Sequence, residues 1–418
     1  MAHAVGDAGW VAWTNGVDAS IAGKLDSTVA SSTYALATEP LAVKLAGDLS
    51  GTVAAPTVPG LALKVDKASL ANNNTRGAGT NALAAITSGG QNTAAGYGAL
   101  AANTSGNYGT AVGYNALSQA TTASGNTAVG AFALVPTTGA LNTAVGAFAL
   151  RVLTTGTNNV AVGYAALMAA TTAIGSIAIG VQALTALTTA TSNIAIGGNA
   201  LVANVTGPAN IAIGTNALAA TTVGPNVAIG YGAMAATTTG YRNTSVGHGT
   251  LGANTTGTTN TAMGDGTLAL NTTGIYNTAI GCDSQKITTT GNRNTAVGVD
   301  ALAALTTGNS NTAVGTGSGG AGVTTATGSF NTHVGETAGP GTGDPSYGLA
   351  LGAYTVAGAN GSVAIGTDSG GAGASSTVAN QFVLGTANHR YLMPGLPTAN
   401  PGAGSGILWS NAGVVTVA

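Results

Sequence analysis

The sequence predicts an all-β fold in which a short repeat is stacked into a parallel β-solenoid, or β-roll. Phrases such as NTAVGVDALAALTTGNS (Asn294 to Ser310) recur through the middle of the chain with a spacing of mostly 17 residues. A fixed short period indicates one structural unit stacked many times. The period is too short for a helix pair, and the copies combine Gly with β-branched Thr, Val and Ile, which disfavour helix.

One copy of the repeat contains a short predicted strand, Asn-Thr-Ala-Val-Gly, in which β-branched residues alternate with small ones. The Asn is expected to hydrogen-bond its copies in neighbouring coils. We expect the Val or Ile, together with a Leu four residues after the glycine, to fill the interior. The Ala and Gly face would then let another layer approach closely. The glycine that closes the strand, here called the marker glycine, recurs at intervals of 17, with 16 twice and 20 once, at Gly96, Gly113, Gly130, Gly146, Gly163, Gly180, Gly197, Gly214, Gly230, Gly247, Gly264, Gly281, Gly298, Gly315 and Gly335.

The repeat also carries an expectation about assembly. One Val and one Leu per coil bury little apolar surface compared with the conformational entropy that ordering a coil costs. Association of copies through the Ala and Gly face would bury more. A parallel homotrimer is a natural closure for a rod, so we expect a trimeric fibre.

The chain divides into five predicted regions. Residues 1–40 form an N-terminal attachment segment, in which Val17, Ile21, Leu25 and Val29 have the spacing of a short amphipathic helix. Residues 41–73 are a connector with turn-forming Pro and Gly, and residues 74–338 hold the 17-residue repeats. Residues 339–378 are irregular repeats, and residues 379–418 are a C-terminal cap or tip that ends in a predicted hairpin from Ile407 to Ala418.

Composition argues against several functions. Only 5% of the residues are charged and the net charge is −2, which offers no attraction to nucleic acid. No apolar run reaches the roughly 18 residues of a spanning helix, so we expect no membrane insertion. The single cysteine, Cys282, cannot form an internal disulfide, and we expect it to be a small half-buried filler.

No catalytic, metal-binding or cofactor-binding constellation emerges from the sequence, so we expect a protein that is not an enzyme and has no cofactor. The four histidines, His3, His248, His333 and His389, lack the spacing of metal ligands with one another or with Cys282. His248 and His333 occupy repeat positions, where we expect surface variation. Carboxylates are scattered one per coil.

Candidate contact residues lie mainly at the ends of the chain. At the C-terminal tip, His389, Arg390, Tyr391 and Trp409 are candidate receptor contacts. In the N-terminal segment, Trp10 and Trp13 are candidate anchors, because buried Trp often dominates interfaces; a small local core is an equal alternative. Tyrosines that follow the marker glycine, at Tyr97, Tyr114, Tyr164 and Tyr231, are further candidates, although packing between coils would also explain them.

The repeats and their flanks resemble known fibre proteins. GTAVGYNAL (from Gly109) and NTAVGVDALAALTTGN (from Asn294) are similar to repeats of bacteriophage tail fibres, and GDLSGTVAAPTVPGLALK (Gly47 to Lys64) resembles a connector near the front of such fibres. SVAIGTDSGGAG (Ser362 to Gly373) and NQFVLG (Asn380 to Gly385) resemble the head repeats and neck of trimeric autotransporter adhesins. The resemblance implies a trimeric fibre that contacts a host surface.

Because neither a signal peptide nor a membrane barrel is visible in the sequence, the resemblance favours the phage fibre. It implies a virion protein, on the tail or another appendage, assembled in the host cytoplasm. Its N-terminus would bind tail or baseplate proteins, and its distal end would bind a host receptor such as a glycan. The alternative is a non-viral surface adhesin or a ligand-binding β-solenoid, such as an ice-binding protein. Most paired Thr lie at turns beside Gly, which argues against an ice-binding face.

Overall fold

The structure is a computed structural model that describes residues 75–320, 326–367, 371–386, 408–411 and 414–417. The chain divides into two compact units, Met1–Leu61 and Ala62–Ala418, and all the described residues belong to the second. The predicted N-terminal helix and both candidate anchors, Trp10 and Trp13, therefore lie outside the described residues.

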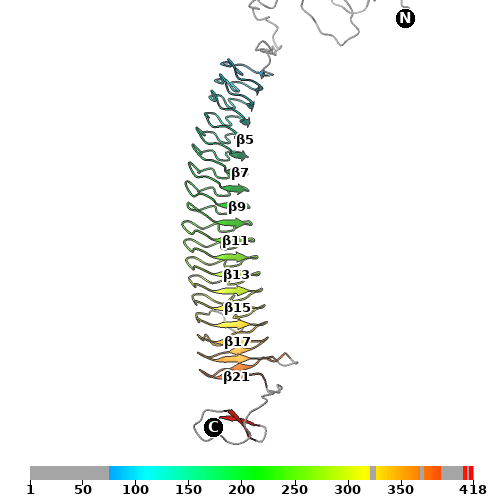
Figure 1. Ribbon diagram of the computed structural model, residues 1–418, viewed down its shortest axis with the longest axis vertical. Helices are drawn as coiled ribbons and strands as arrows, with labels where there is room; N and C mark the ends of the chain where they lie inside the picture. Colours follow the sequence, from blue (N-terminus) through cyan, green and yellow to red (C-terminus); the bar gives the residue numbers. More distant parts are fainter. Residues whose placement is uncertain (1–74, 321–325, 368–370, 387–407, 412–413, 418) are drawn as a thin grey trace, which may run out of the picture. The chain divides into compact units, whose positions relative to one another are not determined.

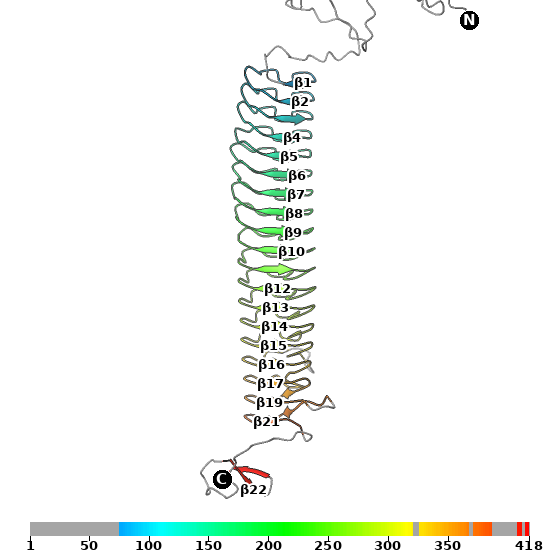
Figure 2. The same ribbon diagram turned by 45° about the vertical axis from the view of Figure 1, so that its right-hand side comes forward.

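The described repeats form a parallel β-solenoid of about 18 turns, as the sequence predicts. Each coil contributes one strand to a 19-stranded sheet, and each strand pairs in parallel with those of the coils before and after it (Figures 1 and 2). No described residue is helical. The strands of this sheet are β1 (Arg76–Ala78), β2 (Thr93–Ala95), β3 (Thr110–Val112), β4 (Thr127–Val129), β5 (Thr143–Val145), β6 (Val160–Val162), β7 (Ile177–Ile179), β8 (Ile194–Ile196), β9 (Ile211–Ile213), β10 (Val227–Ile229), β11 (Thr244–Val246), β12 (Thr261–Met263), β13 (Thr278–Ile280), β14 (Thr295–Val297), β15 (Thr312–Val314), β16 (Thr332–Val334), β17 (Leu349–Leu351), β19 (Val363–Ile365) and β21 (Phe382–Leu384).

The register places equivalent repeat positions directly beside each other. In the pairing of β4 with β5, for example, Thr127 lies opposite Thr143 and Ala128 opposite Ala144. The sheet continues into the irregular repeats, because β17, β19 and β21 join its end. There β18 (Val356–Ala357) and β20 (Ser375–Ser376) form a separate parallel pair.

The interior of the coils is filled by small residues and leucine. The middle residue of the strand, usually Ala, is fully buried, as are the Ala and Leu three and four residues after the marker glycine; Ala144, Ala149 and Leu150 are examples. The expected positions of the small and branched residues are therefore reversed. The strand Ala faces the core rather than another copy, and the Val or Ile before the marker glycine faces outward. A narrow coil has room for a methyl group between its walls but not for a second row of branched side chains.

The buried asparagine ladder confirms the expectation for the repeat Asn. The Asn294 amide donates to the Asn277 Oδ1 at 3.2 Å and to the Gly308 carbonyl at 2.8 Å. The Asn294 Oδ1 accepts in turn from the backbone N–H of Asn311 at 2.9 Å. Each side-chain amide thus satisfies buried backbone groups toward the following coil and bonds the Asn side chain of the preceding one, which explains why Asn recurs at this position.

The marker glycine is required by its backbone. Gly163 has a φ of +132°, and a Cβ placed on it would lie 2.4 Å from the carbonyl oxygen of Gly180 in the next coil. L-residues are strained in this region, and here no space exists for a side chain either.

The C-terminal hairpin also forms as expected, with β22 (Leu408–Asn411) antiparallel to β23 (Val414–Val417).

Candidate functional site

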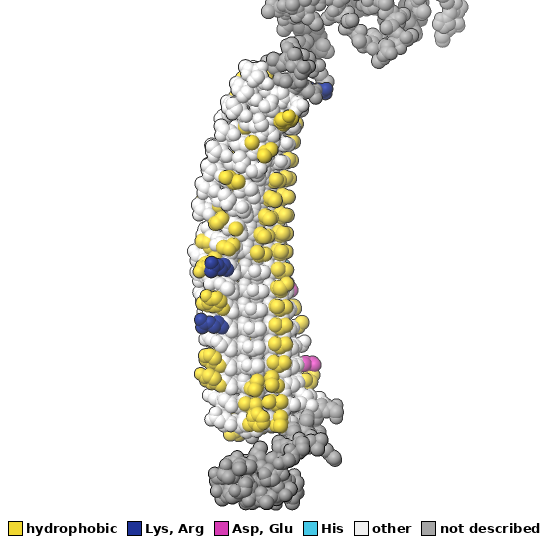
Figure 3. Space-filling view, viewed as in Figure 1, with side chains coloured by type: hydrophobic (Ala, Val, Ile, Leu, Met, Phe, Trp, Pro, Cys, Tyr) yellow, Lys and Arg dark blue, Asp and Glu magenta, His cyan; other side chains and the backbone are white. Residues whose placement is uncertain are grey.

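The outer face of the large sheet carries two rows of side chains, from the first and third residue of each strand. The third position is Val, Ile, Leu or Met from β3 onward, and the first is Thr, Val, Ile, Leu or Phe. We call these two rows the apolar column; it follows the strands along the sheet (Figure 3). Its exposed members at the third position include Val112, Ile179, Ile213, Ile229, Met263, Ile280, Val314, Val334 and Leu384.

The column is most apolar between β6 and β10. In these five strands, the first position is Val or Ile as well, so that both rows are aliphatic. The first position is Thr in β2 to β5 and in β11 to β16, so the Val and Ile of β6 to β10 divide this row of Thr into two parts. No regular Thr face therefore spans the sheet. A continuous exposed apolar surface of this extent is typical of an interaction site.

Two edges border the apolar column. We call the two residues that follow each marker glycine the exit edge, because the chain leaves the strand there. We call the residues five and six positions before each marker glycine the entry edge. Between the entry edge and the strand lies the buried Asn of the ladder.

The exit edge of coils β2 to β6 carries a continuous row of aromatic rings. Tyr97 stacks on Tyr114 with centroids 5.3 Å apart, and Tyr114 meets Phe132 edge to face at 5.2 Å. Phe132 and Phe148 stack at 5.8 Å, and Phe148 meets Tyr164 edge to face at the same distance. The tyrosines do pack between coils, yet about half of each remains exposed, for example 48% of Tyr97. Phe132 and Phe148, which were not among the predicted candidates, stand second after their marker glycines, whereas the candidate tyrosines stand first.

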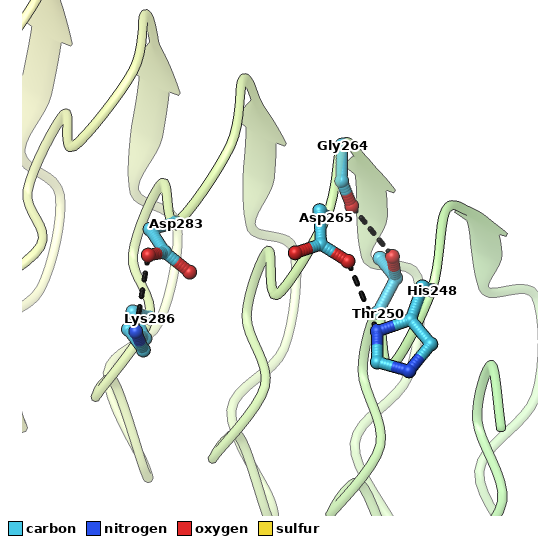
Figure 4. Close-up of polar contacts among 6 residues, drawn as sticks. All are labelled: His248, Thr250, Gly264, Asp265, Asp283 and Lys286. Atoms are coloured by element: carbon cyan, nitrogen blue, oxygen red, sulfur yellow. Dashed lines mark hydrogen bonds and ion pairs between the residues drawn. The ribbon is translucent and has the colours of Figure 1, made fainter. Parts of the chain in front are cut away.

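The exit edge of later coils is acidic. Asp265, Asp283, Asp300 and Glu336 all follow their marker glycines by one or two residues. His248 pairs with Asp265 at 3.0 Å, and Lys286 pairs with Asp283 at 3.0 Å (Figure 4). The side chains of the first pair are 67% and 64% exposed, which places His248 on the surface as expected. Exposed ion pairs of this kind contribute little stability.

The entry edge of the same coils is aromatic and basic. Arg242 lies over the ring of Tyr241 at 5.5 Å, and Arg293 lies over the ring of Tyr276 at 5.8 Å. Among the described residues, neither guanidinium has a carboxylate within ion-pair distance. In the lower part of Figure 3, basic side chains lie to the left of the apolar column and acidic ones at its right margin.

His333 is buried, and the expectation that it varies on the surface is wrong. It occupies the middle position of β16, where most other strands carry Ala, and it is only 2% exposed. Neither ring nitrogen has a hydrogen-bond partner within the described part of the chain. Burial lowers the pKa of His333 from 6.5 to about 4, so the ring is neutral at pH 7.

Cys282 is exposed on the exit edge, so it is not the half-buried filler we expected. Partial desolvation and the carboxylates of Asp283, Asp265 and Asp300 raise its pKa. A raised pKa lowers the thiolate fraction at neutral pH, which argues against a nucleophilic role.

The candidate tip residues His389, Arg390 and Tyr391 lie outside the described residues. Trp409 belongs to β22, where its backbone pairs with Thr416.

Groups of three or more His, Cys, Asp or Glu that could hold a metal ion are absent from the described ranges. Within the same ranges, no helix is long and apolar enough to cross a membrane. Comparisons with protein-family models, curated proteins and solved structures find no match to this chain.

Proposed function

We propose that this chain is a structural fibre of a bacteriophage virion, a tail fibre or a minor tail protein, in which three parallel copies pack together through the apolar column. The observation that carries the proposal is the unbroken apolar column on a solenoid whose own interior is already filled. A column of aliphatic side chains facing water is costly, and burial against other copies removes that cost.

The size of the column fits self-association. With a strand spacing of about 4.8 Å and a three-residue strand about 10 Å long, the face of 19 strands covers roughly 850 Å². A stable protein interface buries about 800 Å² on each partner. In a trimer the column of each copy is shared between two neighbours, so it supplies about half of such an interface to each contact and the flanking surfaces supply the rest.

In this proposal the coils are a rod and the ends make the contacts. The N-terminal segment with Trp10 and Trp13 attaches to tail or baseplate proteins. The distal end, with His389, Arg390, Tyr391 and Trp409, contacts a receptor on the host surface. The repeat residues serve stacking, since Asn, Ala, Leu and the marker glycine of each coil are all used inside the solenoid.

Two experiments test the proposal. Sedimentation equilibrium of the purified chain should give the mass of a trimer, and a folded monomer would contradict the assembly. Electron microscopy of virions labelled with antibody against residues 75–386 should show the label on a tail or another appendage. Absence of the protein from purified virions would refute the virion assignment and favour a surface adhesin.

A further inference from the structure

The two edges of the apolar column change character at the same points along the solenoid. On the exit edge, the aromatic row runs from Tyr97 to Tyr164. On the entry edge, exposed apolar side chains stand in alternate coils before β3, β5 and β7: Tyr108 at 64%, Leu141 at 63% and Ile174 at 46% exposure. In this stretch, the exit edge is aromatic and the entry edge carries no charge and is apolar in every second coil.

Further along the solenoid the edges acquire opposite charge. The exit edge carries Asp265, Asp283 and Asp300, while the entry edge carries Arg242 and Arg293. The charges also lie at matching heights. Arg293 and Asp300 flank the same strand, β14, and Arg242 precedes β11, one coil before Asp265. One coil corresponds to about 4.8 Å along the sheet, which the length of an arginine side chain covers.

We propose that the entry edge of one copy packs against the exit edge of the next copy, with Arg242 and Arg293 facing the carboxylates of Asp265 and Asp300. This inference rests on the proposed self-association and adds the surfaces that meet and the register in which they meet. Each edge is therefore covered by another copy of this chain.

Contact between two different edges is heterologous, and such contacts close only as a ring. If the ring axis runs along the solenoid, all copies are parallel and coils of equal height meet. The uncharged entry edge then meets the aromatic exit edge in the first coils, and the arginines meet carboxylates in the later ones. Equal height follows from the ring symmetry, and the charges are compatible with it. A shift by four coils toward the first repeats would place Arg242 beside Val181 and Arg293 beside Tyr231, both neutral. Like the charged positions of other interfaces, the arginines would add specificity rather than supply most of the affinity.

The native Cys282 allows a direct test by cross-linking of the full chain. Cys282 is on the exit edge after β13, and Tyr276 is on the entry edge before the same strand. Five residues lie between them, three of them in the strand, so within one copy the two positions are six residue steps and up to about 20 Å apart. In Tyr276→Cys, a bismaleimide shorter than this distance can join the new thiol to Cys282 only between copies. We expect covalent dimers and trimers on a denaturing gel, with nothing larger.

Two controls make the cross-link specific. Thr290→Cys places an exposed thiol in the coil after β13, away from both edges, and should give no covalent trimer. The unmodified chain, with Cys282 alone, should not cross-link. Cross-linking of Cys282 to itself would show that like edges meet, and would overturn the inference. Circular dichroism of Tyr276→Cys should match the unmodified chain.

Sedimentation separates failure of the inference from failure of the assembly. A trimer of Tyr276→Cys that forms no cross-link would overturn the edge pairing while leaving the trimer in place. A monomeric unmodified chain would instead refute the proposed self-association.

Charge exchange tests the register. Arg242→Asp with Arg293→Asp makes both edges acidic and should weaken association at low salt by at least about tenfold. Adding Asp265→Arg and Asp300→Arg exchanges the charges of the two edges and should restore association. If the fourfold variant associates no better than the twofold one, the proposed charge pairing is wrong.

Discussion

The imidazole of His333 occupies space that Gly319 leaves open. A Cβ placed on Gly319 would lie 3.1 Å from the Nδ1 of His333. In most coils the position of Gly319, four residues after the marker glycine, holds a buried Leu, and the position of His333 holds Ala. Compared with other coils, Gly319 is a small residue in place of a large one, and His333 is a large residue in place of a small one. The core stays filled, but with a titratable ring that has no partner.

We expect the solenoid to lose stability as pH falls through the range from 6.5 to about 4 because of His333. The unfolded chain takes up a proton near the ordinary pKa of 6.5, while burial lowers the folded pKa to about 4. The unfolded state therefore binds more protons in this window, and the free energy of unfolding falls by about 1.4 kcal/mol per pH unit. The full loss of about 3 kcal/mol is reached near the folded pKa. Urea midpoints measured between pH 7.5 and pH 4 check this.

The control is the double variant Gly319→Leu with His333→Ala, which restores the usual repeat residues. Leu is tolerated with positive φ at this repeat position, as Leu302 with a φ of 52° shows. The double variant should keep its urea midpoint over the same pH range better than the unmodified chain. Equal pH dependence of the two proteins would show that groups other than His333 cause it.

Asn159→Ala should destabilise the solenoid, because the side chain of Asn159 satisfies buried backbone groups of the neighbouring coil. Its amide donates to the Ala173 carbonyl at 2.7 Å, and its Oδ1 accepts from the Ser176 N–H at 3.0 Å. Leaving a buried polar group unsatisfied costs about 1–3 kcal/mol. The adjacent Asn158 is exposed, and its side chain bonds only Thr157. Asn158→Ala therefore leaves no buried group unsatisfied and should cost only the strain of Ala at a φ of 59°, about 1 kcal/mol or less. Similar urea midpoints for both variants would contradict the role of the ladder.

The sequence predicted the β-solenoid fold correctly, because a repeat of fixed short period is typical of stacked coils. It also predicted the Asn ladder, since one residue type at one position in many coils requires a shared partner. The predicted orientation of the two faces of the strand was wrong. Alternation in Thr-Ala-Val separates Ala from Thr and Val, but which side is inside depends on the width of the coil. The burial of His333 was not predicted either. The residue that makes room for its ring, Gly319, belongs to the preceding coil, so the sequence around His333 does not show the space.

The two edges could not be identified from the sequence without the position of the turns. Arg293 and Asp300 are seven residues apart, and only the intervening strand, β14, shows that they flank one face. Likewise, the aromatic row alternates between the first and second position after the marker glycine, so no single repeat position reveals it. Both features depend on the direction in which side chains leave the coil.

Gly163→Ala should prevent folding of the solenoid around β6. Gly163 combines a φ of +132° with a neighbouring carbonyl only 2.4 Å from the position of a Cβ. Gly175→Ala is the matched control, because Gly175 has a φ of +64° and no atom within 4 Å of the added Cβ. Other residues adopt this backbone at equivalent positions, for example Ser192 with a φ of 59°. We expect the control to be soluble with a cost of about 1 kcal/mol; the first variant should be insoluble or sensitive to protease. Equal behaviour of the two would refute the steric explanation.

Ile179→Lys with Ile213→Lys should dissociate the proposed assembly without unfolding the coils. Both side chains lie on the apolar column, with 39% and 36% exposure, and contribute nothing to the filled interior. Two charges per copy on a buried face are costly because they lose water without gaining a partner. The matched control, Thr155→Lys with Thr172→Lys, adds the same charge at exposed turn positions away from the column. Sedimentation should give monomers for the first variant and trimers for the second, with unchanged circular dichroism in both. If the isoleucine variant remains trimeric, copies associate through a different surface.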